Sequence, residues 1–282
     1  MNEQHAPSDA DAVADADLGA RLATAERVVD DAAALALSLF QDRASLVVES
    51  KGLQDWVSEA DRGVEDRIRT ALAEAFPDDG ILGEEREAVA GTSGYTWVID
   101  PIDGTSLFVS GSPGWCVVLA CVHAGQTVLG VIVDPIACDR FTARRGQGVQ
   151  LNGTPIRVAD VADLTQGTVS VGHSTRGPIE PTLSVLRALL EAGGMYQRTG
   201  SGALCLSMVA AGRLIGYLEF HMNAWDCLAA LLFIEEAGGR VEPFDMDNML
   251  RQGGRVIVGA PRVYDALWAM ADPVYPSIAL KS

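Results

Sequence analysis

Lysine is rare in this sequence of 282 residues, and no long hydrophobic run occurs in it. Lys51 and Lys281 are its only lysines among 21 basic residues, which face 38 acidic ones and leave a formal charge of −17. This balance argues against nucleic-acid backbones and anionic membranes as main partners. No segment reaches the roughly 18 apolar residues of a membrane span, and the first residues are acidic rather than basic. We therefore expect neither a membrane span nor a signal peptide.

Paired cysteines and clustered histidines are also missing. The five cysteines are odd in number and form no Cys-x-x-Cys pair, which is typical of reduced thiols in a cytoplasmic protein. The four histidines show no metal-ligand spacing, so a zinc hydrolase has little support. The expected compartment is the cytoplasm, and the candidate metal ligands are carboxylates.

The segment WVIDPIDGT, residues 97–105, carries the most chemical information in the chain. Its apolar start predicts a buried strand that delivers Asp100 and Asp103 to its C-terminal end, where ligands of α/β sheets bind. Gly104 and Thr105 offer backbone N–H groups at an expected helix start, which is a favourable place for phosphate. A hard divalent cation and a phosphate would both fit here.

Two further acidic positions lie at the ends of apolar runs elsewhere in the chain. Residues 80–83 predict a short strand that ends in the acid pair Glu84 and Glu85. The apolar run 227–237, followed by two glycines, predicts a helix with Asp226 near its N-terminus. Mg²⁺ takes oxygen ligands from several segments, so Glu84 and Asp226 are candidate ligands, whereas a solvated position is expected for Glu85. Each acid taken alone could equally cap a helix or solvate a loop.

Together these segments resemble the inositol monophosphatase family of metal-dependent, lithium-sensitive phosphatases. The resemblance extends from about residue 44 to residue 268. Its motifs are GEE at 83–85, DPIDGT at 100–105, FTARRGQG and NGTPIRV within 141–158, RTGSGAL at 198–204, and WDCLAA with EEAGG within 225–239. DPIDGT followed about 120 residues later by WD and AGG is a far more specific pattern than a single glycine motif.

The resemblance implies a site for two or three Mg²⁺ ions that activate water for attack on phosphorus. It implies that the metal ligands are Glu84, Asp100, the backbone carbonyl of Ile102, Asp103 and Asp226. Thr105, hydrogen-bonded to Asp61, would help Glu84 to orient the attacking water. The N–H groups of Gly104 and Thr105 would bind phosphate oxygens that gain charge.

The resemblance also implies how the rest of the substrate is held. Its contacts lie in the second half of the chain, at Ser201, Gly202, Ala203 and Glu219. The Glu219 carboxylate would accept hydrogen bonds from sugar hydroxyls, with a solvated strand end as the alternative. Lys51 corresponds to a lysine near the metal site of the family, but exposure is the commoner situation for a loop lysine. Lithium sensitivity and a homodimer are further expectations of the same kind.

Apolar spacing along the chain predicts the order of the secondary structure. Helices are expected at residues 18–40 and 57–76, whereas residues 1–17 are expected to form a disordered acidic tail. Short apolar runs between residues 81 and 143 predict an antiparallel-rich sheet under these helices. From residue 168 onwards, predicted strands alternate with predicted helices, which is the pattern of an α/β unit.

The predicted fold class is therefore α/β, or α+β over the whole chain. The layered α/β/α/β/α sandwich of the family that the sequence resembles agrees with these elements. That sandwich implies an N-terminal α+β domain over residues 18–160, which carries most metal ligands. A C-terminal α/β domain over residues 161–282 would complete the site.

The predicted function is Mg²⁺-dependent hydrolysis of a small phosphate monoester, with inositol 1-phosphate as the first expected substrate. GSGAL at 200–204 and HMNAWD at 221–226 favour inositol phosphatases, while FVSGSPGW at 108–115 is closer to histidinol-phosphate phosphatases. Fructose-1,6-bisphosphatase and 3′,5′-bisphosphate nucleotidase activities stay open as alternatives. Outside catalysis, a regulatory binding protein that keeps the fold is the second hypothesis. The intact set of acids favours the enzyme.

Overall fold

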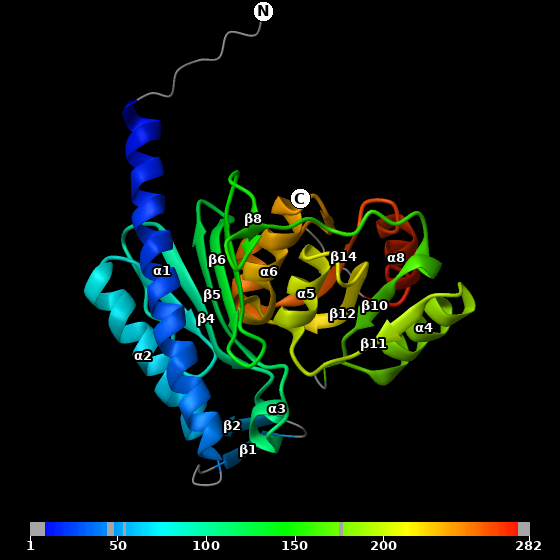
Figure 1. Ribbon diagram of the computed structural model, residues 1–282, viewed down its shortest axis with the longest axis horizontal. Helices are drawn as coiled ribbons and strands as arrows, with labels where there is room; N and C mark the ends of the chain where they lie inside the picture. Colours follow the sequence, from blue (N-terminus) through cyan, green and yellow to red (C-terminus); the bar gives the residue numbers. More distant parts are fainter. Residues whose placement is uncertain (1–8, 44–47, 53–54, 175–176, 276–282) are drawn as a thin grey trace, which may run out of the picture.

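The computed structural model describes residues 9–43, 48–52, 55–174 and 177–275, arranged in five layers (Figure 1). Helices α1 (Asp9–Gln41) and α2 (Glu59–Ala75) cover one face of a seven-stranded sheet. Helices α5 (Gly202–Ala210) and α6 (Ala224–Glu236) lie between this sheet and a five-stranded sheet. Helices α4 (Ile179–Glu191) and α8 (Tyr264–Ala271) cover the outer face of the second sheet. The predicted α/β/α/β/α sandwich is confirmed.

The seven strands of the first sheet lie side by side in sequence order. They are β3 (Gly80–Gly83), β4 (Tyr95–Asp103), β5 (Cys116–His123), β6 (Gln126–Asp134), β7 (Asp139–Arg144), β8 (Val149–Leu151) and β9 (Thr154–Pro155). Strands β3 and β4 are parallel, and every other neighbouring pair is antiparallel. The prediction of an antiparallel-rich sheet under two helices is confirmed.

Helix α1 packs through a stripe of small apolar residues. Ala25, Val29, Ala32 and Ala36 recur every three or four residues and are at most 1% exposed. The helix starts at Asp9, so the prediction of disorder is wrong for residues 9–17, while residues 1–8 lie outside the described part of the chain. Alanine has the highest helix propensity, and acidic residues interact favourably with the dipole at a helix N-terminus. The Ala- and Asp-rich segment therefore extends a helix whose later turns are held by the core.

A short strand pair precedes α2, and the sequence analysis did not predict it. Strand β1 (Val48–Gly52) pairs antiparallel with β2 (Asp55–Ser58). Helix α2 therefore begins at Glu59 instead of residue 57. Lys51 belongs to β1, but its side chain lies outside the described part, so its exposure stays a prediction.

The five-stranded sheet has the order β11-β10-β12-β14-β13. Its strands are β10 (Thr168–Val171), β11 (Met195–Gln197), β12 (Gly216–Met222), β13 (Arg240–Val241) and β14 (Gly254–Gly259), with α7 (Met246–Gln252) before β14. Strand β10 is parallel to both β11 and β12, and β14 is antiparallel to its two neighbours. The expected alternation of strands and helices is confirmed as far as α6.

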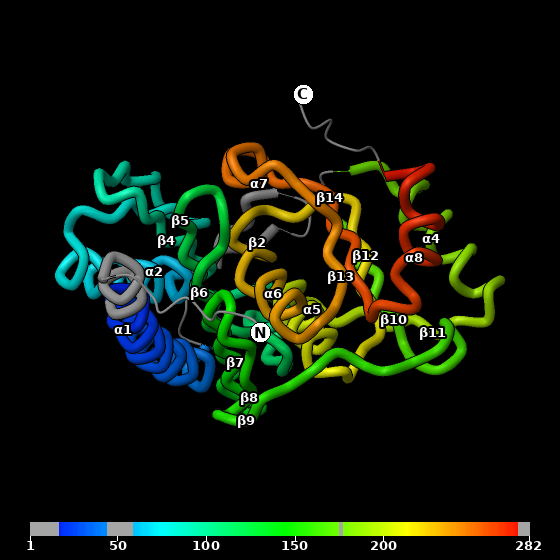
Figure 2. The backbone as a smooth tube through the Cα atoms, turned by 90° about the horizontal axis from the view of Figure 1, so that it is seen from above, coloured from blue at the N-terminus to red at the C-terminus, as the bar shows by residue number. Residues whose placement is uncertain are grey.

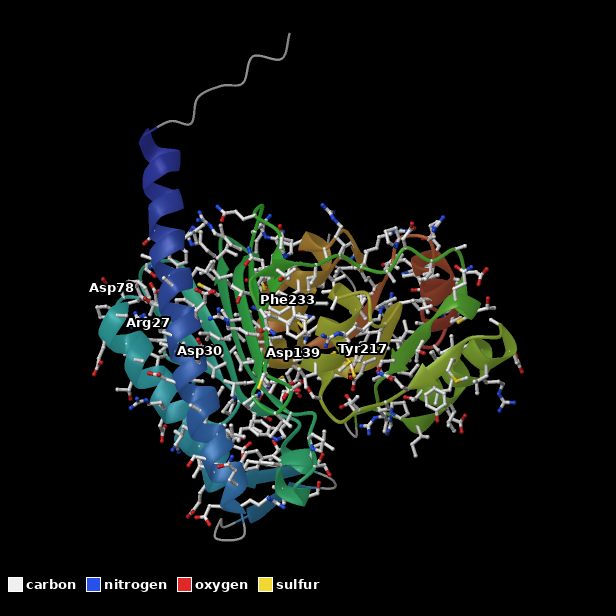
Figure 3. The ribbon with its side chains drawn as sticks, viewed as in Figure 1. Arg27, Asp30, Asp78, Asp139, Tyr217 and Phe233 are labelled. Atoms are coloured by element: carbon white, nitrogen blue, oxygen red, sulfur yellow. The ribbon has the colours of Figure 1, made fainter. Side chains whose placement is uncertain are left out.

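Helix α6 lies in the centre of the molecule, with β-structure on both sides (Figure 2). Its residues from Cys227 to Ile234 are all buried, which explains why its sequence is apolar on every face. The helix approaches the first sheet closely at Gly130, where an added Cβ would lie 2.9 Å from a ring atom of Phe233. The Phe233 ring, labelled in Figure 3, stacks on that of Phe141 at 6.1 Å. The position of α6 is therefore set by packing on both sides.

The two halves of the chain share one apolar cluster, which extends from Val98 in the first sheet through α5 and α6 to Val258 in the second. Residues 156–167 connect β9 with β10 and contain the predicted domain boundary near residue 160, which stays a prediction. Among the helices of the described segments, none is long and apolar enough to cross a membrane.

Candidate functional site

Three carboxylates converge where β4 ends and α6 begins. Asp100 and Asp103 belong to the C-terminal part of β4, and Asp226 to the first turn of α6. One oxygen of each carboxylate lies within 4.8 Å of the corresponding oxygens of the other two. The two β4 acids are buried and Asp226 is half-buried. Acids from distant parts of the sequence thus meet between the first sheet and the central helices.

An irregularity in β4 directs its two acids to one place. Side chains of a regular strand alternate between the faces of a sheet, so positions 100 and 103 would point to opposite faces. Asp100 pairs with Val118 of β5 but Asp103 pairs with Cys116, so β4 contains one more residue than β5 over this interval. Such a bulge redirects the following side chain. The N–H of Ile102 also donates to Oδ1 of Asp100 at 3.1 Å, which fixes that carboxylate.

Burial and neighbouring negative charges raise the pKa of the two acids on β4. Burial raises the pKa of Asp100 well above its ordinary value, and negative charges nearby add to the effect: those of Glu84, Asp103, Asp226 and Asp61. Burial, followed by the charge of Asp226, raises the pKa of Asp103 to about 7. Gathering buried negative charge is costly unless a cation neutralises it. A set of carboxylate oxygens is also what a hard divalent cation prefers, so these residues fit such an ion.

Next to this cluster, Gly104 and Thr105 begin the short helix α3 (Thr105–Ser110). Gly104 has φ of 97°, a left-handed conformation that glycine adopts without strain. The Thr105 hydroxyl lies 3.1 Å from Oδ1 of Asp61 and 3.1 Å from the carbonyl oxygen of Ile102. The hydrogen bond between Thr105 and Asp61 that the resemblance implied is therefore present.

The start of helix α5 holds one of the acids. The Ser201 hydroxyl and the backbone N–H of Ala203 both donate to Oδ2 of Asp103, the latter at 2.7 Å. The Ser201 oxygen also caps α5 by accepting from the N–H of Leu204 at 3.1 Å. Ala203 was expected to contact substrate, but its N–H already binds Asp103 and its side chain is fully buried. Neighbouring Gly202 does line the cavity described next.

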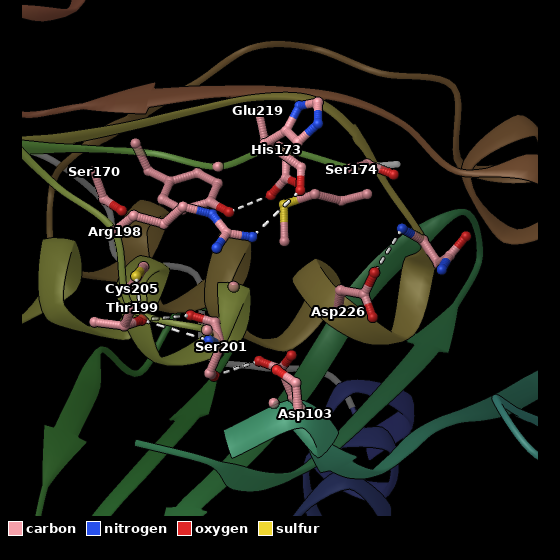
Figure 4. Close-up of a pocket in the computed structure, with 18 of the residues that line it drawn as sticks. Asp103, Ser170, His173, Ser174, Arg198, Thr199, Ser201, Cys205, Glu219 and Asp226 are labelled. Carbon is pink, nitrogen blue, oxygen red and sulfur yellow. Dashed lines mark hydrogen bonds between the residues drawn. The ribbon is translucent and has the colours of Figure 1, made fainter. Parts of the chain in front are cut away.

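A cavity of about 240 Å³ opens beside the acids (Figure 4). Its lining includes eight of the residues that the sequence predicted, from both halves of the chain: Glu84, Asp103, Gly104, Thr105, Ser201, Gly202, Glu219 and Asp226. Glu84 is half-buried at the end of β3 and is not among the three acids that lie within 4.8 Å of one another. The cavity therefore joins the acid cluster to the predicted substrate contacts.

The opposite wall contains polar residues that the sequence analysis did not single out. The Tyr217 hydroxyl donates to Glu219, and burial raises the pKa of Glu219 to about 7. Arg198 lies on the same wall, and its charge lowers the pKa of Glu219. Tyr217 could have been found from its place two residues before Glu219, since alternate strand residues share a face. Arg198 opens the RTGSGAL motif, but the motif does not show that its side chain faces the cavity.

Comparisons with known proteins agree with this geometry. The inositol monophosphatase family matches residues 17–272. Inositol-1-monophosphatase of Mesorhizobium japonicum is 39% identical over 231 residues, 81% of this chain and 87% of the relative. Nus factor SuhB of Pseudomonas aeruginosa is 34% identical over 236 residues, with coverage of 81% and 87%.

Solved structures share the fold over nearly their full length. Extragenic suppressor protein SuhB of Bartonella henselae has a TM-score of 0.84 and 31% identity, over 89% of this chain and 98% of that one. Thermotoga maritima IMPase has a TM-score of 0.80 and 28% identity, with coverage of 90% and 97%. Because the family match includes both sheets and all three converging acids, this chain belongs to the inositol monophosphatase family.

Proposed function

We propose that this member of a phosphatase family hydrolyses a small phosphate monoester with the help of Mg²⁺, and that inositol 1-phosphate is its preferred substrate. The observation that carries the proposal is the meeting of Asp100, Asp103 and Asp226 within 4.8 Å, beside a polar cavity of about 240 Å³. A cavity of this size suits a single phosphorylated ring or short polyol better than a nucleic acid or a protein.

Two or three Mg²⁺ ions are proposed at this cluster. Their ligands would be Glu84, Asp100, the carbonyl oxygen of Ile102, Asp103 and Asp226. When bound, the ions would stabilise charge on phosphoryl oxygens and lower the pKa of a water molecule. The raised pKa of buried Asp103 supports this assignment, because the chain gathers negative charge there that a divalent cation would neutralise.

The side chains around the cluster would position the reactants. Thr105, held by Asp61, is proposed to orient the attacking water together with Glu84, and the hydrogen bond at 3.1 Å supports this role. The backbone N–H groups of Gly104 and Thr105 would bind the phosphate. No covalent phosphoenzyme would be needed, since the oriented water would attack phosphorus directly.

Recognition of the alcohol part of the substrate is assigned to the opposite wall of the cavity. Glu219 belongs to this wall, and its carboxylate can accept hydrogen bonds from ring hydroxyls. Ser201 and Gly202 line the cavity next to Asp103. The relative from Mesorhizobium japonicum is named inositol-1-monophosphatase, which supports the same substrate class. Histidinol phosphate, fructose 1,6-bisphosphate and adenosine 3′,5′-bisphosphate remain the competing substrates.

The proposal is tested by comparing kcat/KM for these four phosphates in the presence of Mg²⁺. Inositol 1-phosphate should have the highest value, and Glu219→Gln should raise its KM about tenfold with a smaller effect on kcat. A higher kcat/KM for one of the other three phosphates would reassign the substrate. Inhibition by Li⁺ is expected, because Li⁺ can occupy a cation position.

A regulatory binding role is the second candidate function. Several similar proteins are named Nus factor SuhB, and one of them matches 81% of this chain. The complete set of acids supports catalysis over binding alone. No phosphate release from any of the four substrates, together with a stable stoichiometric complex with another protein, would favour the binding role instead.

A homodimer in the cytoplasm is the proposed state of the protein. The five free cysteines support a reducing compartment.

Large apolar side chains are exposed along one face of α4 and on the adjoining edge strand β11, namely Ile179, Leu183, Leu190, Met195 and Tyr196. Exposed apolar patches of this kind mark protein contact surfaces, and a second copy of this chain is the proposed occupant.

A further inference from the structure

Glu65 on helix α2 is a fully buried carboxylate that has no role in the proposed reaction. Its relative exposure is 0%. Oε2 accepts from the backbone N–H of Glu85 at 2.7 Å, and Oε1 accepts from the N–H of Arg86 at 3.2 Å. Oε1 also accepts from Nε of Arg69 at 2.6 Å. Both oxygens are thus used, and two of the three donors belong to the segment that directly follows β3.

We propose that Glu65 is a positioning residue that holds Glu84 in place for the metal site, an inference that rests on the proposed function. The N–H of Glu85 belongs to the peptide group that joins it to Glu84. A hydrogen bond to that peptide fixes the backbone orientation at Glu84, and with it the direction in which its side chain leaves the chain. An anionic acceptor makes this bond stronger than a neutral one.

Two neighbouring features are built around this contact. A Cβ on Gly83 would lie 2.2 Å from Oε1 of Glu65, so the carboxylate occupies space that only glycine leaves free. Arg69 pairs with Glu65 and also donates from Nη2 to the carbonyl oxygen of Arg86 at 3.1 Å. The segment after β3 is therefore bound through N–H groups on one side and a carbonyl on the other. An ion pair with three donors also meets the requirement for burying a carboxylate.

The N-terminal end of β3 offers a matched control. Asp79, just before β3, is 5% exposed and accepts hydrogen bonds from Arg21, Trp97 and Ser93. It ties helix α1 to the first sheet, and none of these hydrogen bonds involves the acid cluster. Asp79→Asn therefore makes the same chemical change as Glu65→Gln, because it also turns a buried carboxylate into an amide. It leaves the segment after β3 untouched.

The test compares the two variants with the wild-type protein by calorimetric Mg²⁺ titration without substrate, and by the Mg²⁺ dependence of phosphate release. In Glu65→Gln an NH₂ group replaces one of the two carboxylate oxygens. This donor then faces the N–H of Glu85 or of Arg86, so one of these two hydrogen bonds is lost. We expect the Kd for Mg²⁺ and the half-saturating Mg²⁺ concentration to rise at least about tenfold, while the KM for substrate at saturating Mg²⁺ changes less than about twofold. Asp79→Asn should lower the melting temperature and leave Mg²⁺ binding unchanged.

Several outcomes would overturn the inference. A folded Glu65→Gln protein with wild-type Mg²⁺ affinity would do so, and so would an equal loss of affinity in Asp79→Asn. If Glu65→Gln does not fold, Arg69→Gln becomes the deciding variant, since it removes the contacts to Glu65 and to the carbonyl of Arg86; unchanged Mg²⁺ affinity there would overturn the inference. A wild-type protein that binds Mg²⁺ but releases no phosphate would refute the proposed function, while the binding comparison would still decide the role of Glu65.

Discussion

The hydroxyl group of Ser201 donates a hydrogen bond to Oδ2 of Asp103, across a sequence separation of 98 residues. Ser201 is the N-cap of α5 in the central layer, and Asp103 ends β4 in the first sheet. One side chain therefore both caps a helix and orients an acid of the cluster. The N-terminus of α5 and the proposed metal site therefore depend on the same side chain.

Ser201→Ala should damage both functions of this side chain. Loss of the cap should lower the free energy of unfolding by about 1–2 kcal/mol. Asp103 keeps the hydrogen bond from the N–H of Ala203 but loses the one from the hydroxyl, so Mg²⁺ should bind less tightly. Urea denaturation and Mg²⁺ titration measure the two effects. Ser207→Ala is the control, because the Ser207 hydroxyl donates to the Ala203 carbonyl in the same helix at 2.8 Å and has no contact with Asp103. Equal changes in Mg²⁺ affinity in both variants would contradict the assignment.

Asp226→Asn should abolish turnover while the fold survives. The N–H of Asn223 donates to Oδ2 of Asp226 at 2.9 Å, and an asparagine carbonyl oxygen can accept the same bond. The cap of α6 is therefore kept, whereas one negative charge of the proposed Mg²⁺ site is lost. We expect kcat below about 1% of the wild-type value, with the metal-free protein at least as stable as the wild type because repulsion decreases. Near-normal kcat with Mg²⁺ would contradict the assignment of Asp226 as a metal ligand.

The metal-free protein should lose stability as pH rises through neutrality. Burial raises the pKa of Asp103 from 3.8 to about 7 and that of Glu219 from 4.5 to about 7. Between the ordinary pKa of these carboxyl groups and about pH 7, the folded state binds more protons than the unfolded state. The free energy of unfolding therefore falls as pH rises over this range. Melting temperatures measured in EDTA from pH 4.5 to 8 should show the fall. Asp103→Asn should make the curve flatter, and added Mg²⁺ should restore stability at high pH.

Leu183→Glu should convert the proposed dimer into a monomer. Leu183 is 46% exposed in the middle of α4, and burying a carboxylate there in a dimer interface would cost the hydration of its charge. Sedimentation velocity measures the change in mass. Ile136→Glu is the matched control, since Ile136 is 38% exposed in the turn between β6 and β7. A monomeric wild-type protein, or dissociation in both variants, would rule out this face as the interface.

Much of this fold could be predicted because local patterns and tertiary packing agree. The apolar residues of β4 form a strand between buried neighbours. Helix α6 ends at Glu236, next to its predicted end, but it begins at Ala224, three residues before the predicted run 227–237. The prediction was wrong at residues 9–17, where composition alone indicated disorder. The turns that follow are fixed by Arg21, which donates to Asp79 and lies 3.8 Å from the Tyr95 ring centre, a contact between segments that composition does not reveal.

The meeting of the acids could be predicted only from the combined motifs, since no local rule connects Asp226 with Asp100. The bulge in β4 depends on the register with β5, which is a property of two strands and not of one. For the same reason, the sequence did not reveal that the N–H of Ala203 binds Asp103. Glu65 lies in a helix whose pattern predicts only an amphipathic surface, and its burial depends on the segment after β3.

Helix α6 makes the position of Asp226 depend on how the interior of the protein is packed. The helix that carries Asp226 is wedged between two sheets, with its backbone close against Gly130. A single methyl group added at residue 130 would push the helix outward, although that residue takes no part in the reaction. The affinity for the proposed Mg²⁺ ions would then depend on packing in the interior, so substitutions that loosen or crowd the centre of the molecule should weaken Mg²⁺ binding.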